Sequence, residues 1–264
     1  MIHLEPFGAR VSASSLTHRQ VRELVREHHI VVLDDFGAPG SAEAFSTWCE
    51  GLGEIMMWPF GPVLELVEAD SPTDHIFDHS YVPMHWDGMY KPLIPEFQVF
   101  QCVSEPGPGH GGRTTFCDTT RLLRELDEQT LARWREIVVT YRIQNVVHYG
   151  GKAVSPLVVP HPRTGEPTLR YNEPPVDGDE SFLNKPLHEF AGVEDVVALK
   201  EELRKALYDP RYFYAHDWRA GDVVITDNYG LLHGREAFTH RAPRHLRRVH
   251  VLGDPHFVNP AVTS

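Results

Sequence analysis

The chain has 264 residues, of which 41% are hydrophobic and 23% are charged, a composition typical of a globular protein with a large buried core. Its formal net charge of −12 argues against nucleic acid as a partner, because phosphate backbones are bound by clustered Lys and Arg. We therefore expect no nucleic-acid partner, and the metal and arginine residues described below indicate a small-molecule substrate. The sequence does not indicate an oligomeric state.

The cysteines and the N-terminus indicate a soluble protein of a reducing compartment. Cys49, Cys102 and Cys117 are irregularly spaced and form no CxxC pair, which favours buried thiols over disulfides or a zinc site. The chain begins without a basic or apolar leader region, and no apolar run approaches the roughly 20 residues that a membrane helix needs. We expect a cytoplasmic protein without membrane contact.

The N-terminal part predicts a helix, a strand and a second helix. A capping box at Thr17–Gln20 precedes apolar residues at helical spacing, which predicts a helix over residues 18–28. The apolar run Ile30–Leu33 predicts a short buried strand. A second amphipathic helix is expected over about 42–53.

Beyond residue 55 the sequence changes to short β-rich stretches separated by Gly, Pro and Asp turns. Alternating or continuous apolar residues predict most of the strands, and apolar residues at helical spacing predict the later helices. Strands are expected over 96–103, 114–117, 137–143, 223–226 and about 246–252, and helices over about 120–126, 128–136 and 193–208.

Strands on both sides of helical insertions favour one β core over repeated βαβ units. The architecture that fits is mainly β with α insertions, a double-stranded β-helix (jelly roll, cupin-like) core flanked by helices. We expect a single domain over residues 1–264, with a helix–strand part at 1–55, a possible lid at 58–82 and the jelly-roll core at 83–264. An ordinary long loop is the alternative for residues 58–82.

A metal site is indicated by His85-Trp86-Asp87, because residues i and i+2 of a strand share a face and can reach one ion. Such a pair is a weak signal alone, since a surface or turn pair of these residue types is more common. His233 follows a turn after an apolar strand and could be the third ligand, with a capping or core histidine as the alternative. Two imidazoles and one carboxylate form the facial triad of mononuclear Fe(II) oxygenases, which leaves positions for a 2-oxo acid and dioxygen.

The arginines after His233 suit a dicarboxylate such as 2-oxoglutarate. A guanidinium binds a carboxylate through two parallel hydrogen bonds that lysine cannot reproduce. Arg244 is the expected partner of the far carboxylate, although a generally basic surface stretch over 241–248 is the alternative. Gly111-Gly112-Arg113-Thr114 adds a tight turn and a threonine hydroxyl that can donate to the same carboxylate.

The ordered set of His85-x-Asp87, Gly111–Thr114, His233 and Arg244/Arg248 resembles the taurine dioxygenase (TauD/TfdA) family over most of the chain. The resemblance implies that the two histidines and the aspartate bind Fe(II), with 2-oxoglutarate and dioxygen as co-substrates. It implies that Thr114 and Arg244 hold the far carboxylate of 2-oxoglutarate, and that Arg248 binds an acidic group of the substrate. One departure is Arg113, where the family commonly has an acidic residue.

The stretches Met84–Tyr90, Pro95–Phe100 and Leu231–Glu236 are similar to the PvcB-type branch, whose members act on isonitriles derived from amino acids. This resemblance implies oxidation of a tyrosine-derived isonitrile in secondary metabolism, by desaturation or by oxidative decarboxylation. Tyr90 and Tyr81 could line an aromatic substrate pocket, although core packing is the more frequent fate of such residues. Hydroxylation of a free amino acid or another small acid is the alternative.

Two other classes of protein share parts of this pattern. A zinc-dependent hydrolase would need a general base near the metal and no clamp for a dicarboxylate. A jelly-roll protein that binds metal without turnover would keep the ligands and lack the chemistry. The arginine after the third ligand favours the oxygenase.

Overall fold

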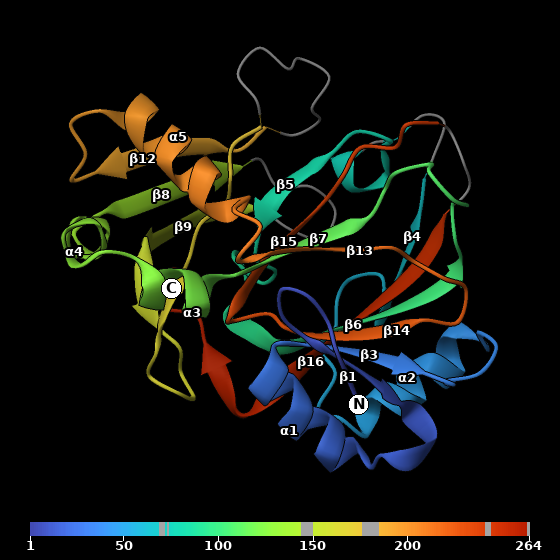
Figure 1. The fold of residues 1–264 in the computed structure, drawn as a ribbon. Helices are drawn as coiled ribbons and strands as arrows, with labels where there is room; N and C mark the ends of the chain where they lie inside the picture. The colour runs from blue at the N-terminus through green and yellow to red at the C-terminus, as the bar shows by residue number, and fades with distance from the viewer. Residues whose placement is uncertain (69–71, 73, 144–149, 176–184, 241–243, 263–264) are drawn as a thin grey trace.

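A computed structural model describes residues 1–68, 72, 74–143, 150–175, 185–240 and 244–262 (Figure 1). Its largest sheet has seven strands, which lie in the order β1 (Ile2–His3), β2 (Ala9–Ser12), β3 (Ile30–Asp34), β14 (Val223–Asp227), β6 (Leu93–Ser104), β16 (His245–Val258) and β4 (Val63–Val67). The second sheet has four strands in the order β13 (Phe213–His216), β7 (Thr114–Asp118), β15 (Leu231–Arg235) and β5 (Val82–His85). Within the described residues, neighbouring strands of these sheets pair antiparallel except β2 with β3, which are parallel.

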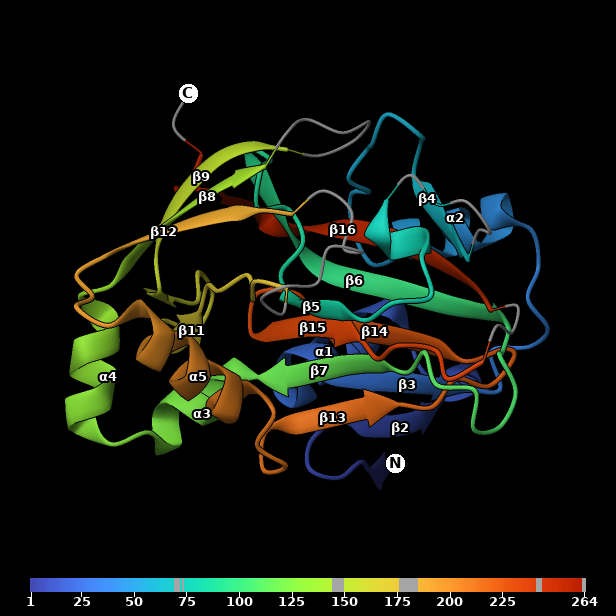
Figure 2. The same cartoon turned by 90° about the horizontal axis from the view of Figure 1, so that it is seen from above.

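The two sheets face one another across an apolar layer. Phe100 and Val224 contribute from the large sheet, and Phe116 and Leu231 contribute from the smaller one. Side chains of successive strand residues alternate between faces, so each sheet sends one row into this layer. This arrangement is the expected jelly roll, and its two sheets are seen in Figure 1 and from above in Figure 2.

Helices α1 (His18–His28) and α2 (Ala42–Glu50) cover the outer face of the large sheet (Figure 1). The capping box at Thr17 is confirmed, because its hydroxyl accepts from the Gln20 N–H and the Gln20 side chain accepts from the Thr17 N–H. Buried residues of both helices pack against strands β6, β14 and β16. Helix α2 ends at Glu50, three residues before the expected end.

The remaining helices and two small sheets form a second apolar region beside the jelly roll (Figure 2). Its helices are α3 (Thr119–Glu125), α4 (Glu128–Arg135) and α5 (Val196–Leu207). Its sheets are β12 (Leu187–Ala191), β8 (Val138–Ile143) and β9 (Gly151–Pro156), and the pair β10 (Val158–Pro160) and β11 (Pro167–Leu169). Within the described ranges, no helix is long and apolar enough to cross a membrane. The three cysteines are buried and free, as expected.

Part of the segment expected as a lid is a strand. Residues 63–67 form β4, which pairs with β16 from Val63 opposite Val249 to Val67 opposite His245. A 3₁₀ turn, η2 (His75–Phe77), lies further along, and residues 69–71 and 73 fall outside the described residues. The alternative of an ordinary long loop therefore does not hold for residues 63–67, and a lid role for the segment stays a prediction. Leu64 and Leu66 are buried and alternate with exposed residues, which is a strand pattern within a segment rich in proline and glycine.

Candidate metal centre

Strand pairing brings the two predicted histidine ligands together. In the antiparallel pair of β5 and β15, His85 and His233 are direct partners. Their ring centroids lie 4.1 Å apart. Directly opposed residues of an antiparallel pair place their side chains on the same face, so the register alone positions two imidazoles side by side.

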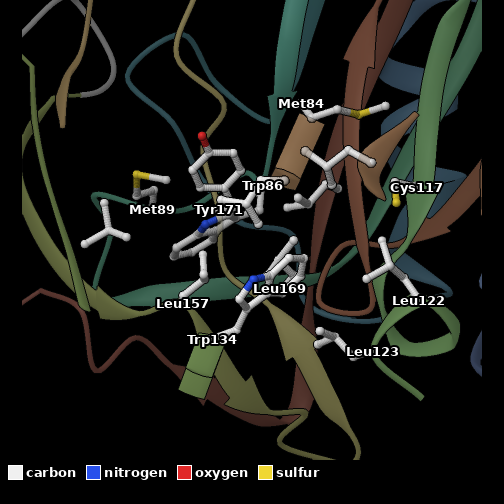
Figure 3. Close-up of a cluster of buried hydrophobic side chains, with 14 of the residues drawn as sticks. Met84, Trp86, Met89, Cys117, Leu122, Leu123, Trp134, Leu157, Leu169 and Tyr171 are labelled. Carbon is white, nitrogen blue, oxygen red and sulfur yellow. The ribbon is translucent and has the colours of Figure 1, made fainter. Parts of the chain in front are cut away.

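Asp87 joins them because side chains alternate along this segment. Met84 and Trp86 are buried in the second apolar region (Figure 3), and the residues after each of them, His85 and Asp87, face the opposite way. The His85 Nε2 lies 3.7 Å from Asp87 Oδ1, and the His233 Nε2 lies 3.8 Å from Asp87 Oδ2. One ligand atom from each of the three residues lies within 4.8 Å of the others. The structure thus brings the predicted set together.

One oxygen of Asp87 is held by three groups. Its Oδ2 accepts hydrogen bonds from Gln98 Nε2 at 2.6 Å and His250 Nε2 at 2.9 Å, and it forms an ion pair with Arg248 Nη1 at 2.7 Å. Burial raises the pKa of Asp87, but the positive Arg248 guanidinium and the neighbouring His233 and His250 rings outweigh burial and hold that pKa well below its usual value. The carboxylate is therefore ionised and fixed in orientation.

The histidines present unprotonated nitrogens to Asp87. The Nδ1 of His85 donates to the Pro83 carbonyl at 2.8 Å, so Nε2 keeps its lone pair. Burial lowers the pKa of His85. Burial and the neighbouring ring of His85 lower the pKa of His233 well below its usual value. Neutral imidazoles are the form that binds a metal ion.

His250 is itself oriented by Trp58. The indole Nε1 of Trp58 donates to His250 Nδ1 at 3.0 Å. An indole N–H can only donate, so His250 carries its hydrogen on Nε2 and directs it at Asp87. Burial lowers the pKa of His250, which keeps this ring neutral. Trp58, His250 and Asp87 therefore form one directed chain of hydrogen bonds.

A cavity beside the metal cluster is lined by His85 and His233 and also by Thr114 and Arg244, which we call the arginine-lined cavity. Thr114 Oγ1 accepts from Trp218 Nε1 at 2.9 Å, so its own hydroxyl hydrogen remains available to a carboxylate. Both residues predicted to hold a far carboxylate thus border the same space as the histidines.

The departure at Arg113 lies away from this cavity. Its guanidinium binds Glu236 through two hydrogen bonds of 2.7 Å, and the side chain is 43% exposed. Thr114, the next residue and the first of β7, faces the opposite side and is buried. The basic residue therefore changes the surface and not the surroundings of Thr114.

A second cavity, which we call the aromatic-lined cavity, borders the other side of the cluster. Its lining includes His85, Asp87, Trp58, Tyr90 and Arg248. The Tyr90 hydroxyl is buried and has no hydrogen-bond partner among the described residues. Burial raises the pKa of Tyr90, so the hydroxyl stays protonated.

Two predicted substrate residues have different surroundings from those expected. Arg248 lines both cavities, but its Nη1 contacts a metal-cluster carboxylate and not open space. Tyr81 does not appear in the lining of either cavity and is half-buried. Its role toward the substrate remains a prediction without support from cavity geometry.

Sequence reasoning missed the residues that orient the cluster. They are Gln98, His250, Trp58 and Asn228, together with Glu68, which contacts Arg244. Gln98 had a usable signal, because it is a polar residue in the middle of a strand with apolar neighbours, and it is buried there like Glu96 and Gln101. The others lie in stretches without a motif, and only the fold brings them to the site.

Known proteins with similar sequences agree with this geometry. The family described as Taurine catabolism dioxygenase TauD, TfdA family matches residues 3–250. A tyrosine isonitrile desaturase from Pseudomonas aeruginosa is 47% identical and covers 97% of this chain and 89% of its own. A 3-((Z)-2-isocyanoethenyl)-1H-indole synthase from Fischerella ambigua is 39% identical and covers 94% of each chain.

A solved structure is similar along the whole chain. It is that of PvcB, an Fe, alpha-ketoglutarate dependent oxygenase from an isonitrile synthetic pathway. The two chains are 41% identical with a TM-score of 0.83, and the match covers 100% of this chain and 94% of the other. The chain belongs to the TauD/TfdA family of dioxygenases.

Proposed function

We propose that this enzyme binds Fe(II) through His85, Asp87 and His233 and desaturates a tyrosine-derived isonitrile. The observation that carries the proposal is the convergence of these three side chains in a chain 47% identical, over 97% of its length, to a tyrosine isonitrile desaturase. Fe(II) is the cofactor and 2-oxoglutarate and dioxygen are the co-substrates of this oxygenase, whose substrate is a small amino-acid-derived carboxylate of secondary metabolism.

The three side chains fit a ferrous ion. They offer two neutral imidazole nitrogens and one ionised carboxylate oxygen, a ligand set that leaves coordination positions open for a 2-oxo acid and dioxygen. When bound, the iron supplies the oxidising chemistry that removes hydrogen from an aliphatic C–H bond. Overall, 2-oxoglutarate and dioxygen become succinate, carbon dioxide and water, and the water carries the two hydrogens lost by the substrate.

The arginine-lined cavity suits 2-oxoglutarate. Its histidine side borders the metal cluster, where the 2-oxo acid end belongs, and Thr114 and Arg244 border the same space. A threonine hydroxyl and a guanidinium can together hold the far carboxylate. These residues position the co-substrate, so its binding geometry is set by protein groups at both ends.

The aromatic-lined cavity suits an aromatic amino-acid derivative. Trp58 and Tyr90 offer ring faces, and Arg248 and Lys91 offer positive charge for a substrate carboxylate. Glu173 also lines this cavity, and burial raises its pKa. A carboxyl group in that state can hydrogen-bond a ring hydroxyl, which favours a phenol over a benzyl group.

A product analysis tests the proposal. The purified enzyme, loaded with Fe(II) and given 2-oxoglutarate and air, is incubated with the isonitriles of tyrosine and tryptophan and with free tyrosine. Mass spectrometry should show loss of two hydrogens from tyrosine isonitrile, at a rate at least tenfold above that with the other two compounds. Loss of carbon dioxide in addition would mean oxidative decarboxylation and would correct the reaction type.

Two controls make the result specific. Asp87→Ala should abolish turnover, while Glu236→Gln, a change at the exposed partner of Arg113, should preserve it. Turnover only of the free amino acid, or gain of an oxygen atom without hydrogen loss, would contradict the desaturase proposal. If the enzyme consumes 2-oxoglutarate but converts none of the three compounds, the oxygenase activity stands and the proposed substrate is wrong.

A further inference from the structure

Arg244 has a buried carboxylate partner within the protein. Glu68 follows directly after β4, and the side chains of both residues are 2% exposed. The Glu68 Oε1 lies 2.8 Å from Arg244 Nη2 and accepts from Arg244 Nε at 3.0 Å. An ion pair so fully removed from water is stable only with good geometry. The contact between Glu68 and Arg244 is therefore unlike an incidental surface contact.

The contacts of Arg244 divide its guanidinium into two edges. Glu68 takes the edge formed by Nε and Nη2, and the Gly112 carbonyl accepts from Nη1 at 2.9 Å. Nη1 and Nη2 each carry a second hydrogen, because a guanidinium has five N–H groups in one plane. With its plane fixed by two partners, the end of the group keeps hydrogens for a third.

Glu68 holds Arg244 from outside the arginine-lined cavity. Arg244 and Thr114 belong to the lining of that cavity, whereas Glu68 does not. The carboxylate therefore holds the guanidinium without bordering the cavity that Arg244 borders. A carboxylate that blocked the site would instead lie among the lining residues.

A second buried guanidinium gives a reason for the Glu68 charge. Arg235 also lines the cavity, and the guanidinium carbons of Arg235 and Arg244 lie 5.4 Å and 5.2 Å from the centroid of the Phe238 ring. Two like charges repel strongly where water is excluded. Glu68 Oε1 is 3.8 Å from Arg235 Nη1, so one carboxylate faces both groups and offsets their repulsion.

We infer that Glu68 is a positioning residue that aims the Arg244 guanidinium at the far carboxylate of 2-oxoglutarate. The inference rests on the proposed role of Arg244 and adds the residue through which that role is achieved. It assigns no contact between Glu68 and the co-substrate. Its consequence is selective: Glu68 supports binding of 2-oxo acids that carry a far carboxylate and is neutral toward those that lack one.

The test compares two 2-oxo acids of equal chain length. The Fe(II)-loaded enzyme is titrated without oxygen, by calorimetry, with 2-oxoglutarate and with 2-oxovalerate, in which a methyl group replaces the far carboxylate. Glu68→Gln should weaken binding of 2-oxoglutarate at least tenfold and change binding of 2-oxovalerate by less than twofold. Equal weakening of both acids would mean a merely structural role, and tighter binding of 2-oxoglutarate would mean that Glu68 competes with it; either result, or no change, overturns the inference.

Matched variants separate this inference from the proposed function. Glu65→Gln changes a 43% exposed carboxylate on β4, three residues before Glu68 and paired with His245 and Arg247, and should alter neither titration. Arg244→Lys should lose the preference for 2-oxoglutarate. If that variant keeps the preference, the proposed co-substrate site is wrong; if it loses the preference while Glu68→Gln keeps it, only the role of Glu68 is wrong.

A second substitution guards against misfolding. Glu68→Asp retains the charge and is one methylene shorter, so it should fold and reduce the preference for 2-oxoglutarate by a smaller factor than Glu68→Gln. Thermal unfolding without co-substrate identifies any variant that has lost its fold. An unchanged preference in a folded Glu68→Asp enzyme would also count against the inference.

Discussion

Asn228 holds Asp87 by both of its backbone polar groups. The Asp87 N–H donates to Asn228 Oδ1 at 3.1 Å, and Asn228 Nδ2 donates to the Asp87 carbonyl at 3.0 Å. A further hydrogen bond runs from Nδ2 to the Pro95 carbonyl at 2.9 Å. Asn228 lies in the turn between β14 and β15, and β15 carries His233. The turn that carries Asn228 therefore fixes the position of Asp87 relative to β15, the strand of His233.

Asn228→Asp should weaken iron binding and destabilise the fold. The new carboxylate oxygen would face two carbonyl groups that have lost their donor, which should cost about 2–4 kcal/mol of unfolding free energy. Displacement of Asp87 should raise the dissociation constant for Fe(II) by about 10–100-fold, the range seen when partners of metal ligands are removed. Anaerobic Fe(II) titration and urea unfolding measure the two effects.

Asn259 provides the matched control. It is buried and donates to the carbonyls of Met89 and Lys91, both at 2.9 Å, so it is a similar structural asparagine that does not contact Asp87. Asn259→Asp should lower stability by a similar amount and change iron affinity less. Equal losses of iron affinity in the two variants would show that Asn228 acts only through general stability.

The cluster itself could be predicted from sequence because its spacing carries physical meaning. His85 and Asp87 share a face by strand alternation, and the family pattern supplies His233. The capping box at Thr17 likewise fixes where a helix starts. For the His85–Asp87 pair and the capping box the determining contacts are local, so a short stretch of sequence contains them; His233 meets them only through the pairing of β15 with β5.

The residues that orient the cluster could not be predicted, because their contacts are not local. His250 reaches Asp87 only since β16 lies beside β6, and Glu68 reaches Arg244 only since β4 pairs with β16. The pattern of apolar and polar residues along one strand does not show which strands lie beside it. The hydrogen bonds on Asp87 Oδ2 therefore became visible only in the assembled sheets.

Arg248 forms an ion pair with the oxygen of Asp87 that also accepts the hydrogen bond from His250, yet removal of the two side chains should affect iron binding differently. Arg248→Gln removes a positive charge that repels a cation, so the dissociation constant for Fe(II) should fall or stay unchanged. The same change should raise the KM for a carboxylate substrate at least tenfold. His250→Phe removes a neutral donor and should raise the Fe(II) dissociation constant about tenfold. A weaker iron site in Arg248→Gln would show that orientation outweighs charge.

Trp58 should influence the metal cluster through His250. Trp58→Phe keeps a ring in the aromatic-lined cavity and removes the donor to His250 Nδ1. His250 can then carry its hydrogen on either nitrogen, so the hydrogen bond to Asp87 is made only part of the time. We expect Trp58→Phe to raise the Fe(II) dissociation constant two- to fivefold. In an enzyme that already carries His250→Phe, the same change should raise that constant by a smaller factor. Additive losses in the double variant would mean that the two residues act independently.

The turn that carries Asn228 should make stability depend on pH. Burial lowers the pKa of His29, but its hydrogen bond with Asp227 and the charges of Asp118 and Glu166 raise that pKa to about 9. The His29 Nδ1 lies 3.0 Å from Asp227 Oδ2, and Asp227 Oδ1 accepts from two backbone N–H groups of the turn.

Because the folded-state pKa of His29 lies above its unfolded value of 6.5, the stabilisation is complete below pH 6.5 and is lost as pH rises through 9. The loss should be at most about 3 kcal/mol. His29→Asn tolerates the positive φ of 61° at this position and should flatten the profile between pH 6 and 10. Urea unfolding at a series of pH values measures both curves. Parallel curves for the two proteins would show that another group causes the pH dependence.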